Sequence, residues 1–274
     1  MLRRARTALP GFRLSLGVTI FYLAVLVLIP LGACIIKAAS LPFDRFWAAV
    51  SSDRAQAAYI FTLVSSFVAA IASTLIGSLI AWVLVRYEFP LKRVFDSIVD
   101  IPFALPTAVA GLVYSSLYAE NGWLGQFLVP LGIKAAYTRL AVVLVLTFIG
   151  FPFVVRAIQP VLEDLDKDME EAAFMLGANR WQIAFRVLLP SLLPAMMTGF
   201  ALAFARGLGE YGSVVFVSGN MPFKTEIAPV LIVSRLESFE YAEATAIAVV
   251  LLSISMSMLV LINLLERWSS RHVG

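Results

Sequence analysis

The chain has 274 residues, of which 61% are hydrophobic and 14% are charged, and its mean hydropathy is +0.90. About a quarter of the residues in a soluble domain are charged, so this composition indicates a protein solvated mainly by lipid. The net charge is +3, and the basic residues are scattered between apolar runs, which argues against nucleic-acid binding. The single cysteine, Cys34, excludes an intrachain disulfide and a Cys-rich metal site. The single histidine, His272, excludes His-based metal sites and histidine-dependent hydrolysis.

Six mostly apolar stretches are long enough to cross a bilayer, which takes about 20 residues of α-helix. They lie at residues 14–36, 57–85, 94–118, 138–158, 190–217 and 242–266. Short polar connections with turn residues separate them, and none is long enough to divide the chain into two globular domains. We therefore predict an all-α polytopic membrane protein in which residues 1–274 form one transmembrane domain with six transmembrane helices.

Lysine and arginine residues indicate the orientation, because cytoplasmic connections carry an excess of them. With a cytoplasmic N-terminus, 13 of these residues fall in inside segments and 7 in outside segments, and only Arg206 falls within a span. Both termini are thus expected in the cytoplasm, together with the connection at 163–188.

The third stretch begins with two prolines, Pro102 and Pro106. Proline prevents a straight helix and frees backbone carbonyl groups. Such a broken helix either borders a cavity, as part of a pathway or gate, or is a structural kink. The sequence leaves both interpretations open.

The fifth stretch contains the only charged residues deep inside an apolar run, Arg206 and Glu210. In a helix they would share one face, together with Gly199, Ala203 and Val217. An ionised arginine costs roughly 2.5–3.5 kcal/mol at the centre of a bilayer, so Arg206 is expected to face protein or water. The pair is either a structural or gating ion pair that holds helices together, or a polar lining of a transport path.

The same stretch matches the dinucleotide fingerprint GxGxxG between Gly207 and Gly212. That fingerprint works only where a strand turns into a helix, and here it lies inside an apolar helical run, so we treat the match as accidental. The chain also lacks a GxxxxGKS/T loop for ATP phosphates. We therefore do not expect an enzyme, and any energy source must come from a partner or an ion gradient.

The connection at 163–188 opens with acidic residues, which favour the start of a helix because they face its free amides. Glu171, Ala172 and Ala173 follow, and Gly177 predicts a helix stop before a second helix. The result is a helical hairpin with an apolar surface. It is either an interfacial amphipathic element or a docking site, in which the alanines admit a partner's surface and Glu171 accepts a partner's donor.

The spacing of this hairpin is Glu-Ala-Ala, three residues, Gly, nine residues and then Val187-Leu188-Leu189-Pro190. It resembles the EAA signature of ABC-importer permease subunits, and departs from it only at Val187, where that family usually has Ile. The resemblance implies that Glu171, Ala172, Ala173 and Gly177 dock in a groove of a cytoplasmic ATPase.

A second segment, from Leu208 to Pro229, resembles the sulfate/thiosulfate permease subunits of the CysT type, and the similarity covers almost the whole chain. Molybdate permeases are similar but typically have Phe-Gly-Ala after the glutamate and Pro-Gly after the asparagine. Here those places hold Tyr211-Gly212-Ser213 and Met221-Pro222-Phe223. The resemblance favours sulfate, with a molybdate or tungstate permease as the alternative.

This resemblance implies the molybdate/methionine-type (type I) ABC importer permease fold, in the inner (plasma) membrane. The implied partners are a homologous permease subunit in a heterodimer, two ATPase subunits that hold ATP and Mg²⁺, and a periplasmic sulfate-binding protein, with no cofactor or metal on this chain. An ion-driven secondary carrier is the less favoured alternative, because such folds often show inverted repeats and several buried ionisable groups.

The outside loop from Ser218 to Arg235, which contains Asn220 and Lys224, is expected to face the binding protein. Its glycine and prolines predict an irregular path, and Lys224 is suited to acidic groups on a docking surface. The alternative is an ordinary solvated loop.

Overall fold

The structure is a computed structural model that describes residues 12–270, and its regular elements there are all helical. Within these residues, five helical stretches are long and apolar enough to cross a membrane: Leu14–Ala39, Asp53–Arg86, Arg139–Asp164, Arg180–Leu208 and Tyr241–Leu264. Residues 1–11 and 271–274, which include the two chain ends expected in the cytoplasm and His272, lie outside the described residues.

The long stretches are built from α1 (Phe12–Leu23), the π-helical turn η1 (Ala24–Leu28) and α2 (Ile29–Ala39); α4 (Asp53–Arg86); α9 (Arg139–Asp164); α11 (Arg180–Ile183), the π-helical turn η3 (Ala184–Leu188) and α12 (Leu189–Leu208); and α15 (Tyr241–Ser270). Shorter elements connect them: α3 (Phe43–Val50), α5 (Lys92–Val99), α6 (Ile101–Ala104), α7 (Thr107–Tyr118), α8 (Gly125–Leu128), the 3-10 turn η2 (Val129–Leu131), α10 (Lys167–Met175), α13 (Val214–Val217) and α14 (Ala228–Glu237). Five of the six apolar ranges in the sequence thus overlap long helices.

The third range, 94–118, is not a single spanning helix. It is divided among α5, α6 and α7, with breaks at Asp100 and at Leu105. Leu105 is extended, with ψ at 126°, because the ring of the following proline disfavours the helical conformation there. In the described residues, five long helices and one broken segment therefore replace the six continuous helices that hydropathy predicts.

The fifth range, 190–217, is also displaced along the chain. Its helix begins at Arg180, because the second arm of the hairpin continues through η3 into α12. It ends at Leu208, and a turn separates it from α13. Glu210 and Val217 therefore do not share a helical face with Gly199, contrary to the helical-wheel prediction.

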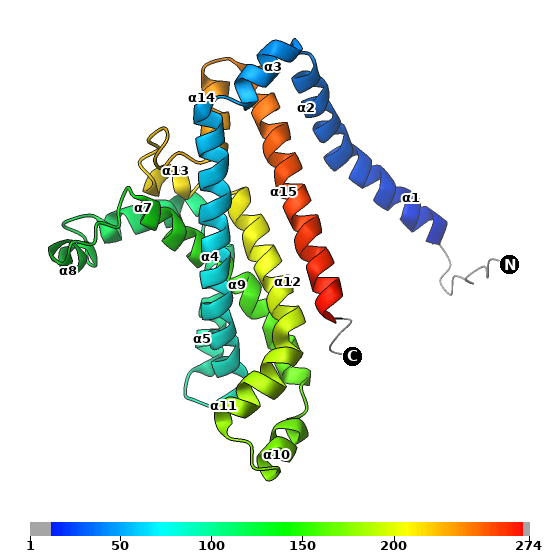
Figure 1. Ribbon diagram of the computed structural model, residues 1–274, viewed down its shortest axis with the longest axis vertical. Coiled ribbons are helices and arrows are strands. Elements are labelled where there is room, and N and C mark those ends of the chain that lie inside the picture. Colours follow the sequence, from blue (N-terminus) through cyan, green and yellow to red (C-terminus); the bar gives the residue numbers. More distant parts are fainter. Residues whose placement is uncertain (1–11, 271–274) are drawn as a thin grey trace.

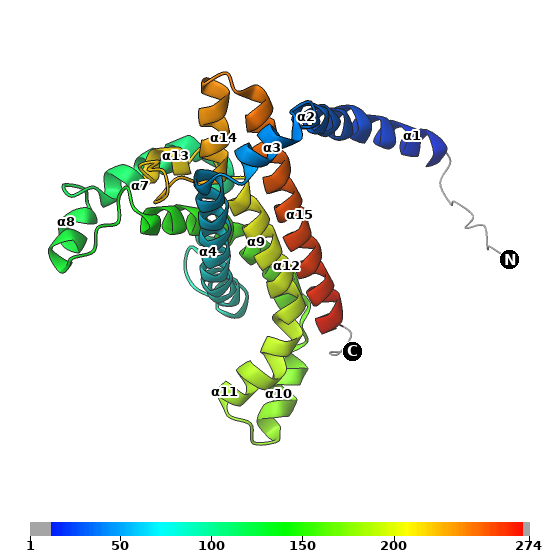
Figure 2. The ribbon, with the colours of Figure 1, turned by 45° about the horizontal axis from the view of Figure 1, so that its top comes forward.

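The centre of the bundle is formed by α4, α9 and α12, which pack side by side (Figures 1 and 2). Lipid supplies little hydrophobic drive for helix association, so the helices must pack closely to attract one another, and small residues allow this close approach. A Cβ atom at Gly77 would lie 2.8 Å from the Cβ of Val154, and one at Gly199 would lie 2.9 Å from its Cα. A Cβ atom at Gly150 on α9 would lie 2.7 Å from the Ser73 hydroxyl oxygen on α4.

The molecule has two distinct ends (Figure 1). The hairpin of α10 and α11 lies at one end, which we call the hairpin end. The short helices α3 and α14 lie at the opposite end, which we call the loop end, and α4 runs between the two. At the loop end α2 packs on α15, and α1 extends away from the bundle with exposed apolar side chains.

The close packing of α9 and α12 predicts a large difference between two Gly→Ala changes. Gly199→Ala places a methyl group against the Val154 backbone, and overpacking of this kind costs about 1–3 kcal/mol. Gly32→Ala, on α2, meets nothing within 4 Å and is the matched control. We expect a lower thermal unfolding midpoint in detergent for Gly199→Ala alone, and equal midpoints for the two variants would contradict the packing.

Candidate functional site

The hairpin at 163–188 begins with a capped helix. The Asp166 carboxylate accepts a hydrogen bond from the Asp168 backbone N–H at 3.1 Å, which satisfies one of the free amides at the start of α10. Asp168 and Glu170 add negative charge in the first turn, where it complements the helix dipole. The acidic residues of this connection therefore stabilise the N-terminus of α10.

Gly177 forms the turn between the two arms. Its φ is +86°, a backbone conformation that favours glycine, and its N–H donates to the Phe174 carbonyl at 2.9 Å. The second arm opens with a capping box, in which the side chains of Asn179 and Gln182 each accept from the other residue's backbone N–H. The helix stop at Gly177 and the second helix from Arg180 are therefore both present.

The hairpin carries a group of large apolar side chains in exposed positions, which we call the hairpin patch: Phe174, Met175, Leu176, Trp181 and Phe185. Leu176 at the tip is 89% exposed, and the rings of Trp181 and Phe185 stack with centroids 5.9 Å apart. Glu171, Ala172 and Gly177 are exposed beside them, and Ala173 is half-buried. An exposed apolar patch of this kind marks an interaction surface.

Arg206 and Glu210 form an ion pair, with 2.6 Å between Nη1 and Oε2. The second carboxylate oxygen of Glu210 accepts from the Ser213 N–H at 2.8 Å and from its hydroxyl at 2.9 Å. The Glu210 side chain is 2% exposed and that of Arg206 is 33% exposed. The pair therefore does not lock two long helices together; it fastens the end of α12 to the turn that follows, while part of the guanidinium stays accessible.

The broken segment meets this turn through two glycines. A Cβ at Gly111 on α7 would lie 2.3 Å from the Ser213 carbonyl oxygen, and one at Gly212 would lie 2.3 Å from the Thr107 hydroxyl. Gly111 has no room for a side chain, because backbone atoms fill the space, and at Gly212 the Thr107 hydroxyl would have to move. The fold thus places the start of α7, directly after Pro106, against the turn that Glu210 holds, although the two are far apart in the sequence.

Arg156 on α9 is a polar residue of this region that the sequence analysis missed. Its guanidinium donates two hydrogen bonds to the Asp100 carboxylate, at 2.9 and 2.7 Å. It also donates one to the Asp96 carboxylate at 2.7 Å and one to the Asp96 backbone carbonyl at 2.9 Å. Asp100 lies at the hinge between α5 and α6, just before the buried Pro102. Asp96 and Asp100 are four residues apart, so a shared helical face was the available signal.

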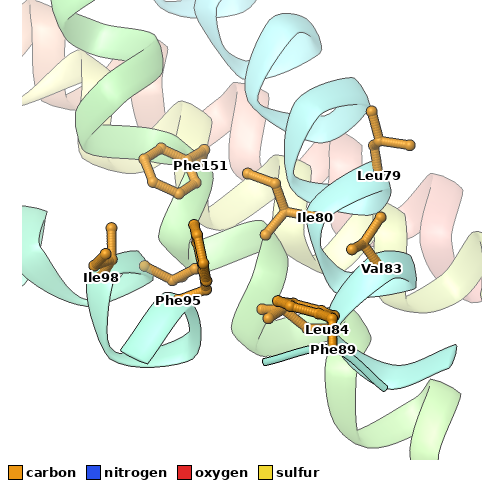
Figure 3. Close-up of a pocket in the computed structure, with 9 residues that line it drawn as sticks. Leu79, Ile80, Val83, Leu84, Phe89, Phe95, Ile98 and Phe151 are labelled. Carbon is orange, nitrogen blue, oxygen red and sulfur yellow. The ribbon is translucent and has the colours of Figure 1, made fainter. Parts of the chain in front are cut away.

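An apolar groove of about 410 Å³ lies between α4, α5 and α9 (Figure 3). Ile80 from α4, Phe95 from α5 and Phe151 from α9 point toward one another across it, and its lining residues are all apolar. The groove therefore does not suit an oxyanion. Nor do three or more His, Cys, Asp or Glu side chains gather as metal ligands anywhere in the described residues.

The predicted outside loop, 218–235, is irregular only up to residue 227, because residues 228–235 belong to α14. Asn220 has a φ of +50° and donates its side-chain amide to the Val215 carbonyl at 2.7 Å, so this side chain supports the loop from within. The exposed tip is formed by residues 221–224, which include Lys224. Of the two predicted loop residues, Lys224 is thus the one available to a partner.

This loop is anchored to α4 by polar contacts. Arg54 donates two hydrogen bonds to the Glu226 carboxylate, at 2.8 and 2.6 Å, and the Glu226 side chain is 3% exposed. The Ala228 N–H donates to the Thr62 hydroxyl on α4 at 2.8 Å. The loop is therefore held in one position although its tip is exposed.

The Arg206–Glu210 geometry predicts an order of stability among three variants. Arg206→Met removes the cation from a buried carboxylate, and breaking a buried pair from one side costs about 3–5 kcal/mol. Glu210→Gln leaves the arginine unpaired, although water can reach part of it. The double change Arg206→Met with Glu210→Gln leaves neither charge, so we expect it to give the most assembled protein by size-exclusion chromatography in detergent. A double variant no better than either single one would show that the residues are not coupled.

Residues 73–274 match the model of the family described as binding-protein-dependent transport system inner membrane component. The probable sulfate transport system permease protein cysT of Nephroselmis olivacea is 49% identical, over 94% of this chain and 91% of that protein. The sulfate transport system permease protein CysT of Escherichia coli K12 is 45% identical, over 98% of each.

Among solved structures, a chain of a bacterial ABC transporter involved in the import of the acidic polysaccharide alginate has a TM-score of 0.76 to this chain. It is 16% identical, and the match covers 94% of this chain and 96% of that one. A likeness at this identity shows the fold alone, which is that of type I ABC importer permeases. Given the family model and the full-length relatives, this chain belongs to the family of binding-protein-dependent transport system inner membrane components and, within it, to the CysT-type permeases.

Proposed function

We propose that this chain is the transmembrane permease subunit of an ATP-driven importer for sulfate or thiosulfate in the inner (plasma) membrane. The observation that carries the proposal is the similarity to CysT sulfate permeases, at 45% and 49% identity over nearly the whole chain. That similarity includes both the hairpin and the outer loop. The residues at 211–213 and 221–223, which differ from the molybdate pattern, support the same substrate.

The hairpin patch docks in a groove of a cytoplasmic ATPase, which binds ATP and Mg²⁺. Three features support this role: the exposure of Phe174, Met175 and Leu176, the turn at Gly177, and the accessible carboxylate of Glu171. With the hairpin end at the ATPase, both chain termini belong in the cytoplasm. The chain itself performs no covalent chemistry.

The substrate passes between this chain and a homologous permease subunit. Because Glu210 offsets the charge of Arg206, the partly exposed guanidinium would attract a dianion without trapping it. The tight contact of α7 with the turn after α12 supports a gating role for Pro102, Pro106 and this ion pair, since a shift of the broken segment must move the turn.

The tip of the outer loop contacts a periplasmic sulfate-binding protein. The anchoring of the loop by Arg54 and Glu226 supports this role, because a docking surface held in place loses little conformational entropy on binding. Lys224 supplies a cation for acidic groups on that protein.

The direct test is to co-express the chain with a homologous permease subunit and the ATPase, reconstitute the complex in liposomes, and measure ATP hydrolysis. We expect the ATPase to co-purify and its activity to rise when sulfate-loaded binding protein is added. A larger rise with molybdate-loaded binding protein would favour the molybdate alternative. Failure of any ATPase to co-purify would contradict the proposal and favour an ion-driven carrier.

The turn at Gly177 predicts different effects for two substitutions. Gly177→Val forces a β-branched residue to a φ of +86°, which strains the turn that presents the patch. Gly177→Asn is the matched control, because asparagine tolerates this conformation and a Cβ atom at this position would meet nothing within 4 Å. We expect sulfate uptake per ATP hydrolysed to fall for the valine variant only. Normal coupling with valine would show that the turn does not serve docking.

The exposed loop tip predicts a site of crosslinking. A photo-reactive side chain at Phe223 or Lys224 should capture sulfate-loaded binding protein in spheroplasts, because both residues are exposed at the loop end. The same group at Leu91, which is 68% exposed but directly precedes α5 toward the hairpin end, is the control and should not. Equal capture at all three positions, or none at the loop, would count against docking there.

A further inference from the structure

The longest helix of the described chain, α4, is clamped at both of its ends. It has 34 residues and no proline, and at 1.5 Å per residue it is about 50 Å long. An arginine stands near each end, and each is paired with a glutamate from a distant segment. Figure 1 shows α4 running from the loop end to the hairpin end.

The clamp at the loop end compensates an unfavourable position. Arg54 is the second residue of α4, where the positive end of the helix dipole opposes a cation. The buried carboxylate of Glu226 offsets this through two hydrogen bonds, and Ala228 adds a third contact to α4 through Thr62. The outer loop is therefore tied to α4 on both sides of Ile227.

The clamp at the hairpin end uses Glu170, which directly precedes the Glu171-Ala172-Ala173 sequence. Arg86 is the last residue of α4, and its Nη2 lies 2.6 Å from Oε1 of Glu170 on α10, an ion pair whose geometry is not that of a hydrogen bond. The Arg86 side chain is only 10% exposed and lies over the Trp82 ring, 5.8 Å from its centroid. Glu170 thus pairs with α4, while its neighbour Glu171 remains exposed for a partner.

Between the clamps, α4 has little freedom to bend or slide. It packs against α9 and α12 through small residues such as Ser66, Ser73 and Gly77. A contact this close leaves no space for a local change in one helix, so a displacement of α4 carries its neighbours with it. The helix is therefore suited to transmit a displacement from one end to the other.

We infer that α4 is a strut that links the binding-protein loop to the ATPase hairpin, with Arg54–Glu226 and Arg86–Glu170 as its two end fastenings. The four residues are positioning residues, since none of them is placed at the substrate or at the nucleotide. The inference rests on the proposed function, in which the hairpin docks the ATPase and the loop docks the binding protein. Loading the binding protein would then act on ATP hydrolysis through α4, and nucleotide would act reciprocally on binding-protein affinity.

The test measures how strongly sulfate-loaded binding protein stimulates ATP hydrolysis by the complete complex in liposomes. The variants are Glu170→Gln, Glu226→Gln and the double variant. Glu120→Gln and Lys134→Gln are the matched controls, because each weakens a surface ion pair that does not involve α4, with side chains 76% and 71% exposed. Arg54→Lys serves as a second variant at the loop end, since it keeps the cation but loses the two-pronged contact.

We expect each single variant to keep its ATPase bound and its basal rate of ATP hydrolysis. The stimulation by sulfate-loaded binding protein should fall about three- to tenfold. The swapped pair Arg86→Glu with Glu170→Arg should recover part of it. The stimulation of the double variant should be no lower than that of the more impaired single variant, because the two fastenings act in series on one helix. Distant sites normally combine additively, so this result would not arise from independent local damage.

Two results would overturn the strut. One is stimulation in the single variants equal to that of the wild type and the controls. The other is a double variant whose losses multiply, which would mean that the two ion pairs act separately. Absent stimulation in the wild-type complex is a different outcome, because it would contradict the proposed function as well.

Discussion

Close packing at small residues is the constraint on which this structure depends. Inside a bilayer the lipid chains are as apolar as leucine, so helices gain little from burying apolar surface against one another. Contacts such as Gly199 against the Val154 backbone bring α4, α9 and α12 close enough for van der Waals attraction and interhelical hydrogen bonds to hold them. The three helices form a unit, and the other elements are attached to it.

The charged residues show how the attachments are made. Arg156 on α9 holds the hinge of the broken segment through Asp96 and Asp100, while Arg54 and Arg86 hold the outer loop and the hairpin to α4. Within the turn after α12, Glu210 accepts hydrogen bonds from Ser213 and pairs with Arg206. Each of these carboxylates or guanidinium groups would be costly near lipid without its partner. The parts expected to move or to dock are thus fastened by ion pairs at the two ends and at the hinge.

The local features of this fold could be predicted from the sequence, and the tertiary ones could not. Hydropathy places the long helices, and the hairpin turn follows from Gly177, because the signals lie within a few residues of the structure they specify. The early end of α12 could not be predicted, since it depends on Glu210 capping a turn that α7 packs against. Nor could the Arg54–Glu226 pair, whose members are 172 residues apart in the chain. The candidate docking residues could therefore be identified from the sequence, whereas the contacts that connect them to the bundle could not.

These contacts imply that the hairpin and the outer loop move together with the α4–α9–α12 unit. This joint movement is tested most directly by electron–electron distance measurements between spin labels at Asp168→Cys and Phe223→Cys, in a Cys34→Ser background, with and without ATP. We expect one distance distribution within the chain in both states, while labels on the hairpins of the two permease subunits change their separation. A shift of about 5 Å or more within the chain, roughly one helical turn, would contradict it.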